Sequence, residues 1–324
     1  MHTLEQLQEL LNSAFEKENF IKKPENLYLP IDYTLRQGGK RIRPTLMLAA
    51  CEMFDGNIED CISAAIGLEI FHNFTLLHDD IMDQSPMRRG METVYKKWNT
   101  NTAILSGDVM YGIAFEYFLK NNHPNLLSIL NLFTKTTMEI CDGQQLDVDL
   151  EKDNNVTVPR YIEMIRLKTA VLLASALRIG ACYAYASEED QKAIYDFGIM
   201  LGLAFQLQDD WLDCYGNQHK LGKTIGLDIA DNKKTFLYTT ALAIANPQKK
   251  DQLKYLYSTD KIKGREKQDL VIRLFDELDI KQKTLVEIEK YHNEAIQLLE
   301  SIGVASEKKE VLRALAERLL GREY

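Results

Sequence analysis

The sequence contains the pattern D-D-x-x-D twice, at residues 79–83 and 209–213. In a helix, side chains four residues apart point about 40° from each other, so the first and last Asp of each copy share a face. Like charges at this spacing destabilise a helix unless a cation lies between them. Carboxylate oxygens suit Mg²⁺, which proteins commonly bind through one or two carboxylates plus phosphate oxygens. The pattern predicts a metal-dependent diphosphate site with six candidate metal ligands: Asp79, Asp80, Asp83, Asp209, Asp210 and Asp213.

Basic residues stand close to the first copy in the sequence. Residues 38–44 read G-G-K-R-I-R-P, and Pro44 suits the first turn of a helix, whose positive end disfavours the preceding cations. A bound anion would remove this conflict, because helix N-termini and arginine forks both bind phosphate. Arg88 and Arg89 follow Asp83 by five and six residues. In isolation, each segment also fits a solvated basic loop, and a single D-D-x-x-D fits a solvated helix end.

The elements that carry these residues are predicted to be helices. Apolar residues recur at steps of three and four from Ile62 to Ile81 and from Ile194 to Leu212, which predicts a buried stripe before each motif. No segment alternates with period two, and no Pro interrupts residues 160–246. No Gly/Ser-rich linker divides the chain. We therefore expect an all-α protein that forms a single domain over residues 1–324 with ten or more helices.

Composition narrows the class of protein. The formal net charge is −9 over 324 residues, which argues against a general nucleic-acid binder. The first twenty residues alternate charged with apolar side chains, so neither a signal peptide nor a membrane span is indicated. The five Cys include no C-x-x-C pair, as expected for reduced thiols. We expect a cytoplasmic protein with no nucleic-acid partner and no stable membrane insertion.

Six motifs in order resemble those of the head-to-tail trans-prenyl diphosphate synthases, the farnesyl and geranylgeranyl diphosphate synthase family. They cover most of the chain: G-G-K-x-x-R-P at 38–44, D-D-x-x-D at 79–83 followed by R-R-G at 88–90, G-Q-x-x-D at 143–147, K-T at 168–169, F-Q-x-x-D-D-x-x-D at 205–213, and G-K-x-x-G-x-D-I-x-x-x-K at 222–233. The resemblance implies an isoprenoid synthase fold around a deep central cavity. It also implies a homodimer, with the two aspartate motifs facing across that cavity and holding three Mg²⁺, for which Mn²⁺ could substitute.

The resemblance also implies residue roles and partners. Isopentenyl diphosphate would be bound by Lys40, Arg43, His72 and Arg89. The allylic diphosphate (dimethylallyl, geranyl or farnesyl) would be bound by Arg88, Lys168, Thr169, Gln206, Lys223 and Lys233. Metal ions and the cations Arg88, Lys168, Lys223 and Lys233 would neutralise the departing pyrophosphate. Residues 214–228 would form a flap over it, although a flexible connector fits that composition almost as well.

Product length is predicted from residues before the first motif. Phe74 precedes Asp79 by about 7.5 Å along a helix axis, and Phe71 lies one turn further. The resemblance implies that an aromatic residue here limits products to C15–C20. Thr75 departs from the paired aromatics of eukaryotic farnesyl enzymes, and the motif lacks the two-residue insertion common in bacterial ones. These features favour a geranylgeranyl over a farnesyl product, unless Phe74 is merely part of the core stripe.

Four alternatives to a short-chain prenyltransferase can be compared with the sequence. A longer-chain polyprenyl diphosphate synthase would usually carry a small residue in place of Phe74. A class I terpene cyclase would usually lack a second intact D-D-x-x-D and would not need residues 38–44. A non-catalytic synthase subunit would have lost carboxylates, and both motifs are intact here. An acidic helical protein that merely binds cations would leave Lys40, Arg43, Arg88 and Arg89 without a role.

Overall fold

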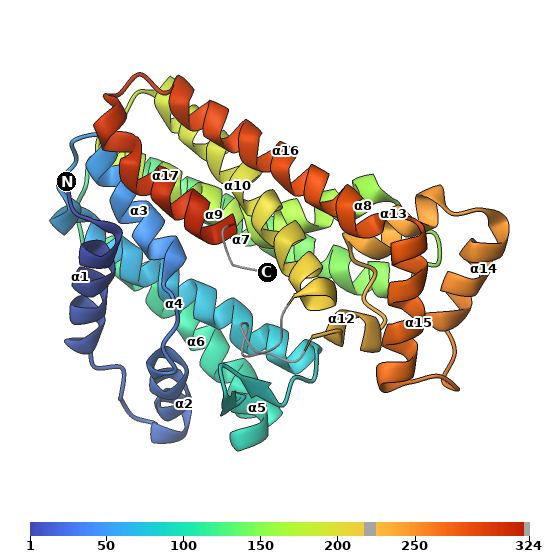
Figure 1. Ribbon diagram of the computed structural model, residues 1–324. Helices are drawn as coiled ribbons and strands as arrows, with labels where there is room; N and C mark the ends of the chain where they lie inside the picture. Colours follow the sequence, from blue (N-terminus) through green and yellow to red (C-terminus); the bar gives the residue numbers. More distant parts are fainter. Residues whose placement is uncertain (217–224, 321–324) are drawn as a thin grey trace. The chain divides into compact units, whose positions relative to one another are not determined.

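The computed structural model describes residues 1–216 and 225–320, most of which are helical (Figure 1). The prediction of an all-α protein with ten or more helices is confirmed. The chain forms two compact units. Unit 1 comprises Met1–Phe133, Ala176–Lys192 and Val304–Leu312, and unit 2 comprises Thr134–Ser175, Ala193–Gly303 and Arg313–Tyr324. The single domain over residues 1–324 stays a prediction.

Unit 1 contains the N-terminal helices and a short antiparallel hairpin. Its elements are α1 (Leu4–Glu16), α2 (Glu25–Arg36), α3 (Ile42–Met53), α4 (Ile58–Met82), β1 (Met87–Arg88), β2 (Met91–Glu92), α5 (Val94–Lys97) and α6 (Thr100–Leu119). Four further helices contribute residues to both units: α7 (Leu126–Lys152), α9 (Val171–Tyr183), α10 (Glu188–Tyr215) and α17 (Ser306–Leu320).

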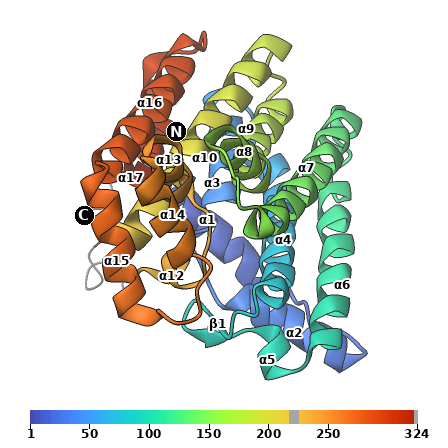
Figure 2. The same ribbon diagram turned by 90° about the vertical axis from the view of Figure 1, so that its right-hand side faces the viewer.

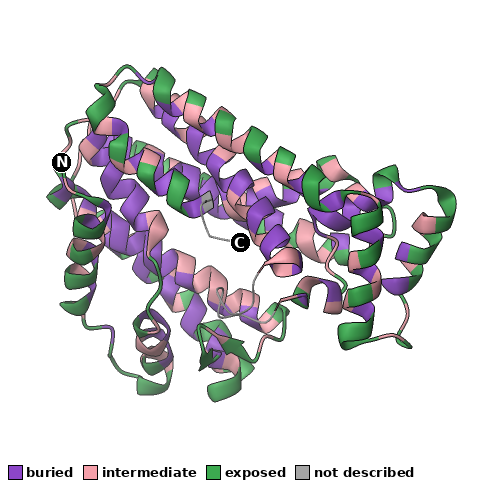
Figure 3. Ribbon diagram, in the orientation of Figure 1, coloured by how far each residue is buried: buried purple, intermediate pink, exposed green. Residues whose placement is uncertain are grey.

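The core of unit 1 is built around α4. Asn57 caps its start by accepting from the backbone N–H of Glu59 at 3.2 Å, as Asn does at helix N-termini. α4 and α6 lie along each other in both views (Figures 1 and 2). They approach closely at Gly67, where a Cβ would lie 2.8 Å from the backbone oxygen of Ala114. α3 is buried over almost its whole length (Figure 3). The predicted stripe before Asp79 thus lies in a core.

Unit 2 contains the remaining elements. They are α8 (Val158–Ile165), the π-helical turn η1 (Arg166–Ala170), α12 (Leu227–Ala230), α13 (Phe236–Ile244), α14 (Pro247–Leu256), α15 (Gly264–Glu277) and α16 (Ile280–Ser301). Tyr238, Phe275 and Ile280 are buried in its apolar core. The ammonium group of Lys234 donates to the backbone oxygens of Leu150, Glu151 and Asp153, which caps the negative end of α7.

No helix within residues 1–216 and 225–320 is both long and apolar enough to cross a membrane.

Candidate active site

The first aspartate motif (79–83) ends α4. Asp79 is half-buried, Asp80 is buried, and Asp83 is the exposed C-cap residue. At this end of a helix the carboxylates face the negative pole of the macrodipole as well as one another. A cation bound here therefore lowers the free energy of the folded chain.

Arg88 supplies part of that positive charge. Its Nε donates to Oδ1 of Asp80 at 2.7 Å, and its Nη2 lies 3.7 Å from Oδ2 of Asp79. Burial raises the pKa of Asp80 to about 6, and Arg88 opposes that rise. Arg88 reaches the motif because a two-residue turn joins β1 to β2. Both turn residues, Arg89 and Gly90, have positive φ, as a type I′ hairpin requires.

A cluster of nitrogen donors forms where the start of α3, the middle of α4 and the hairpin meet. Nη1 of Arg43 lies 3.1 Å from Nε2 of His72. Arg89 donates through Nη1 to the backbone oxygen of Gly38 and to Oδ1 of Asn73, the latter at 3.3 Å. We call Arg43, His72 and Arg89 the arginine site. The structure thus brings together three of the four residues predicted to bind isopentenyl diphosphate.

The protonation state of His72 follows from this geometry. Arginine can only donate, so Nε2 of His72 accepts and the ring proton lies on Nδ1. Burial, with the charges of Arg43 and Arg89, holds the pKa of His72 well below its usual value. Burial also lowers the pKa of Arg43 to about 10, which leaves it charged at neutral pH. The arginine site therefore offers guanidinium charge and a neutral imidazole N–H donor.

The other cations of the 38–43 loop are placed differently. Lys40 is exposed, and its backbone oxygen accepts from Nε2 of Gln8 at 3.2 Å. Arg41 lies 4.2 Å from the centre of the Phe15 ring and donates to Oδ1 of Asn12 at 2.7 Å. Arg41 is therefore held by α1.

The second aspartate motif (209–213) lies near the end of α10, with Asp209 half-buried and Asp210 buried. Asp210 accepts from the Tyr161 hydroxyl, from Nε2 of Gln206 at 3.1 Å and from the backbone N–H of Phe236 at 3.4 Å. Burial raises the pKa of Asp210 to about 7, and these hydrogen bonds oppose the rise. Thr169 donates to Oε1 of Gln206 at 3.0 Å, so two residues with the same predicted role are in contact.

Asp213 anchors the chain that follows the motif. Its carboxylate accepts from the backbone N–H groups of Leu227 at 3.2 Å and Asp228 at 3.0 Å. The N–H of Lys233 in turn donates to the backbone oxygen of Asp228 at 2.8 Å. Asp213 therefore fixes the turn that carries Lys233.

The start of the predicted flap over residues 214–228 is helical in the structure. α10 continues through Tyr215 and Cys214 is buried in the apolar core of unit 2, so the first two residues of the predicted flap belong to a helix. Lys223 lies outside the described residues.

Lys168 lies in η1, and its Nζ donates to Oδ2 of Asp147 on α7 at 2.6 Å. A Cβ on Gly143 would lie 2.4 Å from the backbone nitrogen of Lys168, so α7 and η1 approach each other at a distance that only glycine permits. π-helical turns are frequent at functional sites. This contact places the Lys168 side chain against Asp147, which lies on α7 one turn beyond Gly143.

Phe74 and Phe71 belong to an aromatic cluster within unit 1. Phe71 is fully buried, and its ring centre lies 5.6 Å from that of Phe74 and 5.1 Å from that of Phe133 on α7. Phe74 is half-buried and contacts Tyr111 of α6 at 5.6 Å. Phe115 of α6 joins Tyr111 to Phe133. The residues predicted to set product length thus lie in one cluster, with Phe74 at its partly accessible edge.

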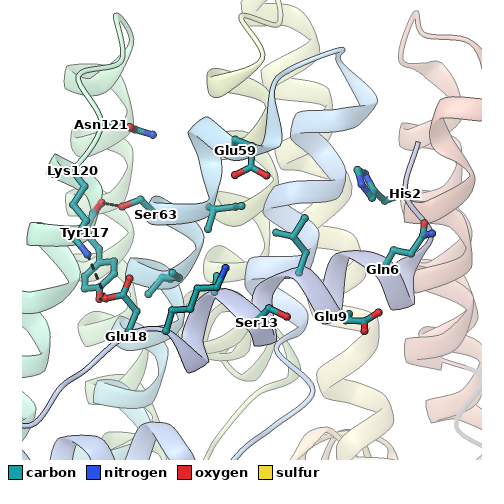
Figure 4. A pocket seen from close by; sticks show the side chains of 15 residues that line it. His2, Gln6, Glu9, Ser13, Glu18, Glu59, Ser63, Tyr117, Lys120 and Asn121 are labelled. Carbon is teal, nitrogen blue, oxygen red and sulfur yellow. Dashed lines mark hydrogen bonds and ion pairs between the residues drawn. The ribbon is translucent and has the colours of Figure 1, made fainter.

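A groove of about 680 Å³ in unit 1 lies elsewhere, between α1, the start of α4 and the end of α6 (Figure 4). Some of its polar groups bind one another: Tyr117 donates to Glu18, and Ser63 donates to the backbone oxygen of Tyr117. Ile66, one of its lining residues, precedes Asp79 by thirteen residues, which is about 20 Å along α4. The groove is therefore separate from the first aspartate motif.

Comparison with known proteins decides the family, because the sequence profile of the polyprenyl synthetases matches residues 24–274. The chain belongs to the polyprenyl synthetase family. It is accordingly a prenyltransferase with the isoprenoid synthase fold. A crystal structure of a geranylgeranyl pyrophosphate synthase matches it with a TM-score of 0.95 and 41% identity, covering 100% of both chains.

Two polyprenyl synthetase relatives are equally similar in identity and differ in product. Geranylgeranyl diphosphate synthase of Methanosarcina mazei is 40% identical over 233 residues, and geranylfarnesyl diphosphate synthase of Natronomonas pharaonis is 40% identical over 247 residues. In each case the match spans 71% of this chain and 72% of the relative. The predicted prenyl diphosphate synthase resemblance is confirmed, and short-to-medium product lengths are supported.

The donor set of this polyprenyl synthetase fits a divalent metal that is shared with a diphosphate. Within the described part of the chain, no three His, Cys, Asp or Glu side chains converge enough to hold a metal by themselves. Mg²⁺ commonly completes its shell with phosphate oxygens and water, so one or two carboxylates of a motif suffice. A related geranylgeranyl pyrophosphate synthase of Corynebacterium glutamicum, 25% identical with a TM-score of 0.83 over 99% of this chain and 97% of that one, was solved with isoprenyl diphosphate and magnesium.

Three residues of the polyprenyl synthetase site carry no role in the sequence-based prediction: Asn73, Asp147 and Tyr161. Asp147 was visible as part of G-Q-x-x-D, although that motif does not indicate its pairing with Lys168. Tyr161 lies seven residues before Lys168, a helical spacing that could have suggested a shared face. Asn73 lies beside His72, and no sequence pattern marks it.

Proposed function

We propose that this protein condenses isopentenyl diphosphate head-to-tail with an allylic diphosphate, releasing pyrophosphate and forming a prenyl diphosphate one C5 unit longer. The allylic C–O bond breaks and pyrophosphate leaves with the electron pair. The isopentenyl double bond attacks the resulting cation, and a proton is lost from the new carbon skeleton. The observation that supports this reaction best is the arginine site, which lies in the same unit as the first aspartate motif and offers a separate seat for a second diphosphate.

The arginine site would hold the diphosphate of isopentenyl diphosphate, which stays intact in the reaction. Arg43 and Arg89 supply charge, and His72 donates through Nδ1. Lys40, exposed in the loop before α3, adds a further cation. Because a guanidinium binds phosphate oxygens through two parallel N–H groups, this set orients the substrate as well as attracting it.

The leaving diphosphate would contact a second set of residues: Arg88, Lys168, Thr169, Gln206, Lys233 and, outside the described residues, Lys223. Their contacts in the substrate-free chain support this role. Arg88 and Lys168 already stand at carboxylates, so each is oriented and held close to where anionic oxygen would bind. Positive charge fixed around a leaving pyrophosphate stabilises it as the C–O bond breaks.

We propose Mg²⁺ as the metal, with three ions expected and Mn²⁺ as a substitute. Bound metal supplies Lewis-acid stabilisation of the leaving pyrophosphate. We propose that the carboxylates of both motifs hold it: Asp79, Asp80, Asp83, Asp209, Asp210 and Asp213. Asp80, Asp210 and Asp213 also accept hydrogen bonds from the protein, which orient their side chains.

We propose geranylgeranyl diphosphate as the main product, with farnesyl diphosphate second. The aromatic cluster supports a closed floor, because Phe74 is backed by Phe71 and Tyr111. The similarity to a geranylfarnesyl diphosphate synthase supports a longer product as the competing assignment. A class I terpene cyclase and a non-catalytic subunit remain the less favoured alternatives.

We propose a homodimer whose contact face includes α6. Ile104, Leu105 and Leu119 expose 41%, 57% and 56% of their surface, and Leu127 at the start of α7 exposes 73%. These exposed apolar side chains along α6 and the start of α7 are the observation that supports this face. Light scattering after gel filtration should give twice the chain mass, and Leu105→Glu should reduce it to the monomer.

One experiment tests the proposed function. The purified protein is incubated with Mg²⁺, isopentenyl diphosphate and each of dimethylallyl, geranyl and farnesyl diphosphate, and the dephosphorylated products are separated by length. Pyrophosphate release with a C20 product from each primer is expected. A C25 or longer product would favour the competing length, a cyclised product without isopentenyl diphosphate would favour a cyclase, and no product would favour a non-catalytic subunit.

A further inference from the structure

Asn73 is a buried polar residue that lies between an acidic and a basic group. Its Nδ2 donates to the backbone oxygen of Glu69 at 2.8 Å and to Oε1 of Glu69 at 3.1 Å, while its Oδ1 accepts from Nη1 of Arg89 at 3.3 Å. Both Glu69 atoms are acceptors and Arg89 is a donor, so only one orientation of the amide satisfies all three contacts. Glu69 therefore fixes the direction in which Asn73 presents its oxygen.

The guanidinium group of Arg89 contacts neutral oxygen atoms and packs closely against the backbone at Gly39. It donates to the backbone oxygen of Gly38, and a Cβ on Gly39 would lie 2.9 Å from its Cζ. An amide or peptide oxygen orients a guanidinium without cancelling its charge, whereas a carboxylate in contact would form an ion pair. These contacts thus leave the charge of Arg89 available to an anion.

Glu69 balances this charge from within the core. Its side chain is 3% exposed, on the turn of α4 before His72 and Asn73. Burial raises the pKa of Glu69, and the charges of Arg89 and Arg43 oppose that rise. A buried acid near several arginines reduces their mutual repulsion, so that they can converge before an anion arrives.

We propose that Asn73, oriented by Glu69, is a positioning residue that directs Arg89 toward the diphosphate of isopentenyl diphosphate. This inference rests on the proposed function of the arginine site. It adds a residue that touches no reacting atom and acts through Arg89 alone. Its removal should weaken the binding of isopentenyl diphosphate and spare the binding of the allylic substrate.

Two substitutions and one control test the proposal. Asn73→Ala should raise the KM for isopentenyl diphosphate about tenfold, the size expected for a lost hydrogen bond to a charged group, and leave kcat and the allylic KM within about twofold. Asn73→Asp, which preserves the side-chain shape, should raise that KM at least as much, because a carboxylate pairs with Arg89. Asn12→Ala removes the amide partner of Arg41 and should leave both KM values unchanged.

A double-mutant cycle separates positioning from general packing. In an Arg89→Ala background, Asn73→Ala should cause no further rise in the KM for isopentenyl diphosphate, because its effect passes through Arg89. Melting temperatures of all variants show whether folding is affected. Equal rises in both KM values, additive effects in the double variant, or an isopentenyl KM within about twofold of wild type would each overturn the proposal.

Calorimetric titration with isopentenyl diphosphate in EDTA keeps the inference distinct from the proposed function. A wild-type protein that binds isopentenyl diphosphate but forms no product contradicts the proposed function and leaves the positioning effect measurable as a change in Kd. A wild-type protein that forms product, with unchanged Kd and KM in Asn73→Ala, contradicts the positioning role alone.

Discussion

At the residue scale, the aspartates of the two motifs have identical sequence patterns and different surroundings. Asp80 binds Arg88, Asp210 binds Tyr161 and Gln206, and Asp213 binds two backbone N–H groups. Hydrogen bonds of this kind orient a metal-binding carboxylate, which keeps further lone pairs for the metal. The orientation of these three carboxylates therefore depends on neighbours that the motif itself does not contain.

The metal assignment can be tested by asparagine substitution. Asp79→Asn, Asp80→Asn and Asp209→Asn should lower kcat about a hundredfold or more, since each removes a charged oxygen from the proposed metal site. Asp210→Asn should in addition lower the unfolding free energy by about 1–3 kcal/mol, because both oxygens of Asp210 accept hydrogen bonds and an amide nitrogen cannot accept. Steady-state kinetics and urea unfolding measure the two effects. An unchanged kcat in all of these variants would contradict the assignment.

His72 leads to a prediction about pH. Its folded-state pKa lies well below the usual 6.5, so the unfolded chain takes up a proton that the folded chain does not. The unfolding free energy of the wild type should therefore fall relative to that of His72→Gln as pH drops below about 6.5. Urea unfolding at pH 7.5, 6.5 and 5.5 measures the difference. Parallel curves for the two proteins would show that His72 titrates normally.

At the element scale, backbone packing positions the cations of unit 2. Gly143 lets α7 approach η1, and the side chain of Asp147 one turn later then reaches Lys168. Lys234 anchors the end of the same helix through three backbone oxygens. Lys168 is therefore placed by contacts between elements, and a change in helix spacing should affect catalysis.

Gly143→Ala tests this dependence on spacing. The new methyl group meets backbone atoms of Leu167 and Lys168 that cannot rotate away, so the unfolding free energy should fall by about 1–3 kcal/mol and kcat should fall with it. Gly303→Ala, where a Cβ meets nothing within 4 Å, is the matched control and should stay within about 0.5 kcal/mol of wild type. Equal effects of the two substitutions would argue against close packing as the cause.

The aromatic cluster joins α4, α6 and α7 and leads to a prediction about product length. Phe74→Ala removes the ring at its accessible edge, so products should lengthen by at least one C5 unit, and Phe71→Ala should extend them further in the double variant. Product chromatography and melting temperature distinguish the two roles of Phe74. A purely structural Phe74 would show the same product with a loss of about 3–5 kcal/mol in stability.

At the scale of the whole molecule, ligand binding should stabilise the folded chain. The carboxylates of each motif repel one another, so Mg²⁺ together with pyrophosphate should raise the melting temperature, by an amount equivalent to about 2.7 kcal/mol at a hundred times the dissociation constant. EDTA should reverse the shift. Differential scanning measurements with metal alone, pyrophosphate alone and both together provide the controls. A melting temperature unaffected by the combination would contradict a metal-diphosphate site.

Much of the fold can be derived from the sequence, because the relevant signals are local. Apolar residues three and four apart from Ile62 to Ile81 predicted a helix, and the structure has one over Ile58–Met82, capped by Asn57. The spacing of four within D-D-x-x-D placed carboxylates on one helix face, as observed. Pro44 marked the first turn of α3. These features depend on residues within one or two turns of each other, where helix geometry alone determines the outcome.

The tertiary structure decided which side chains are partners. Tyr161 and Asp210 are 49 residues apart, and Arg89 and Asn73 are 16 apart, so no helical period relates the members of either pair. The neutral state of His72, the commitment of Asp80 to Arg88 and the burial of Phe71 behind Phe74 arise from the same long-range packing. The sequence by itself determined the chemistry available to the chain. Which atom carries each role depends on the fold, because burial and hydrogen-bond partners exist only after distant segments pack together.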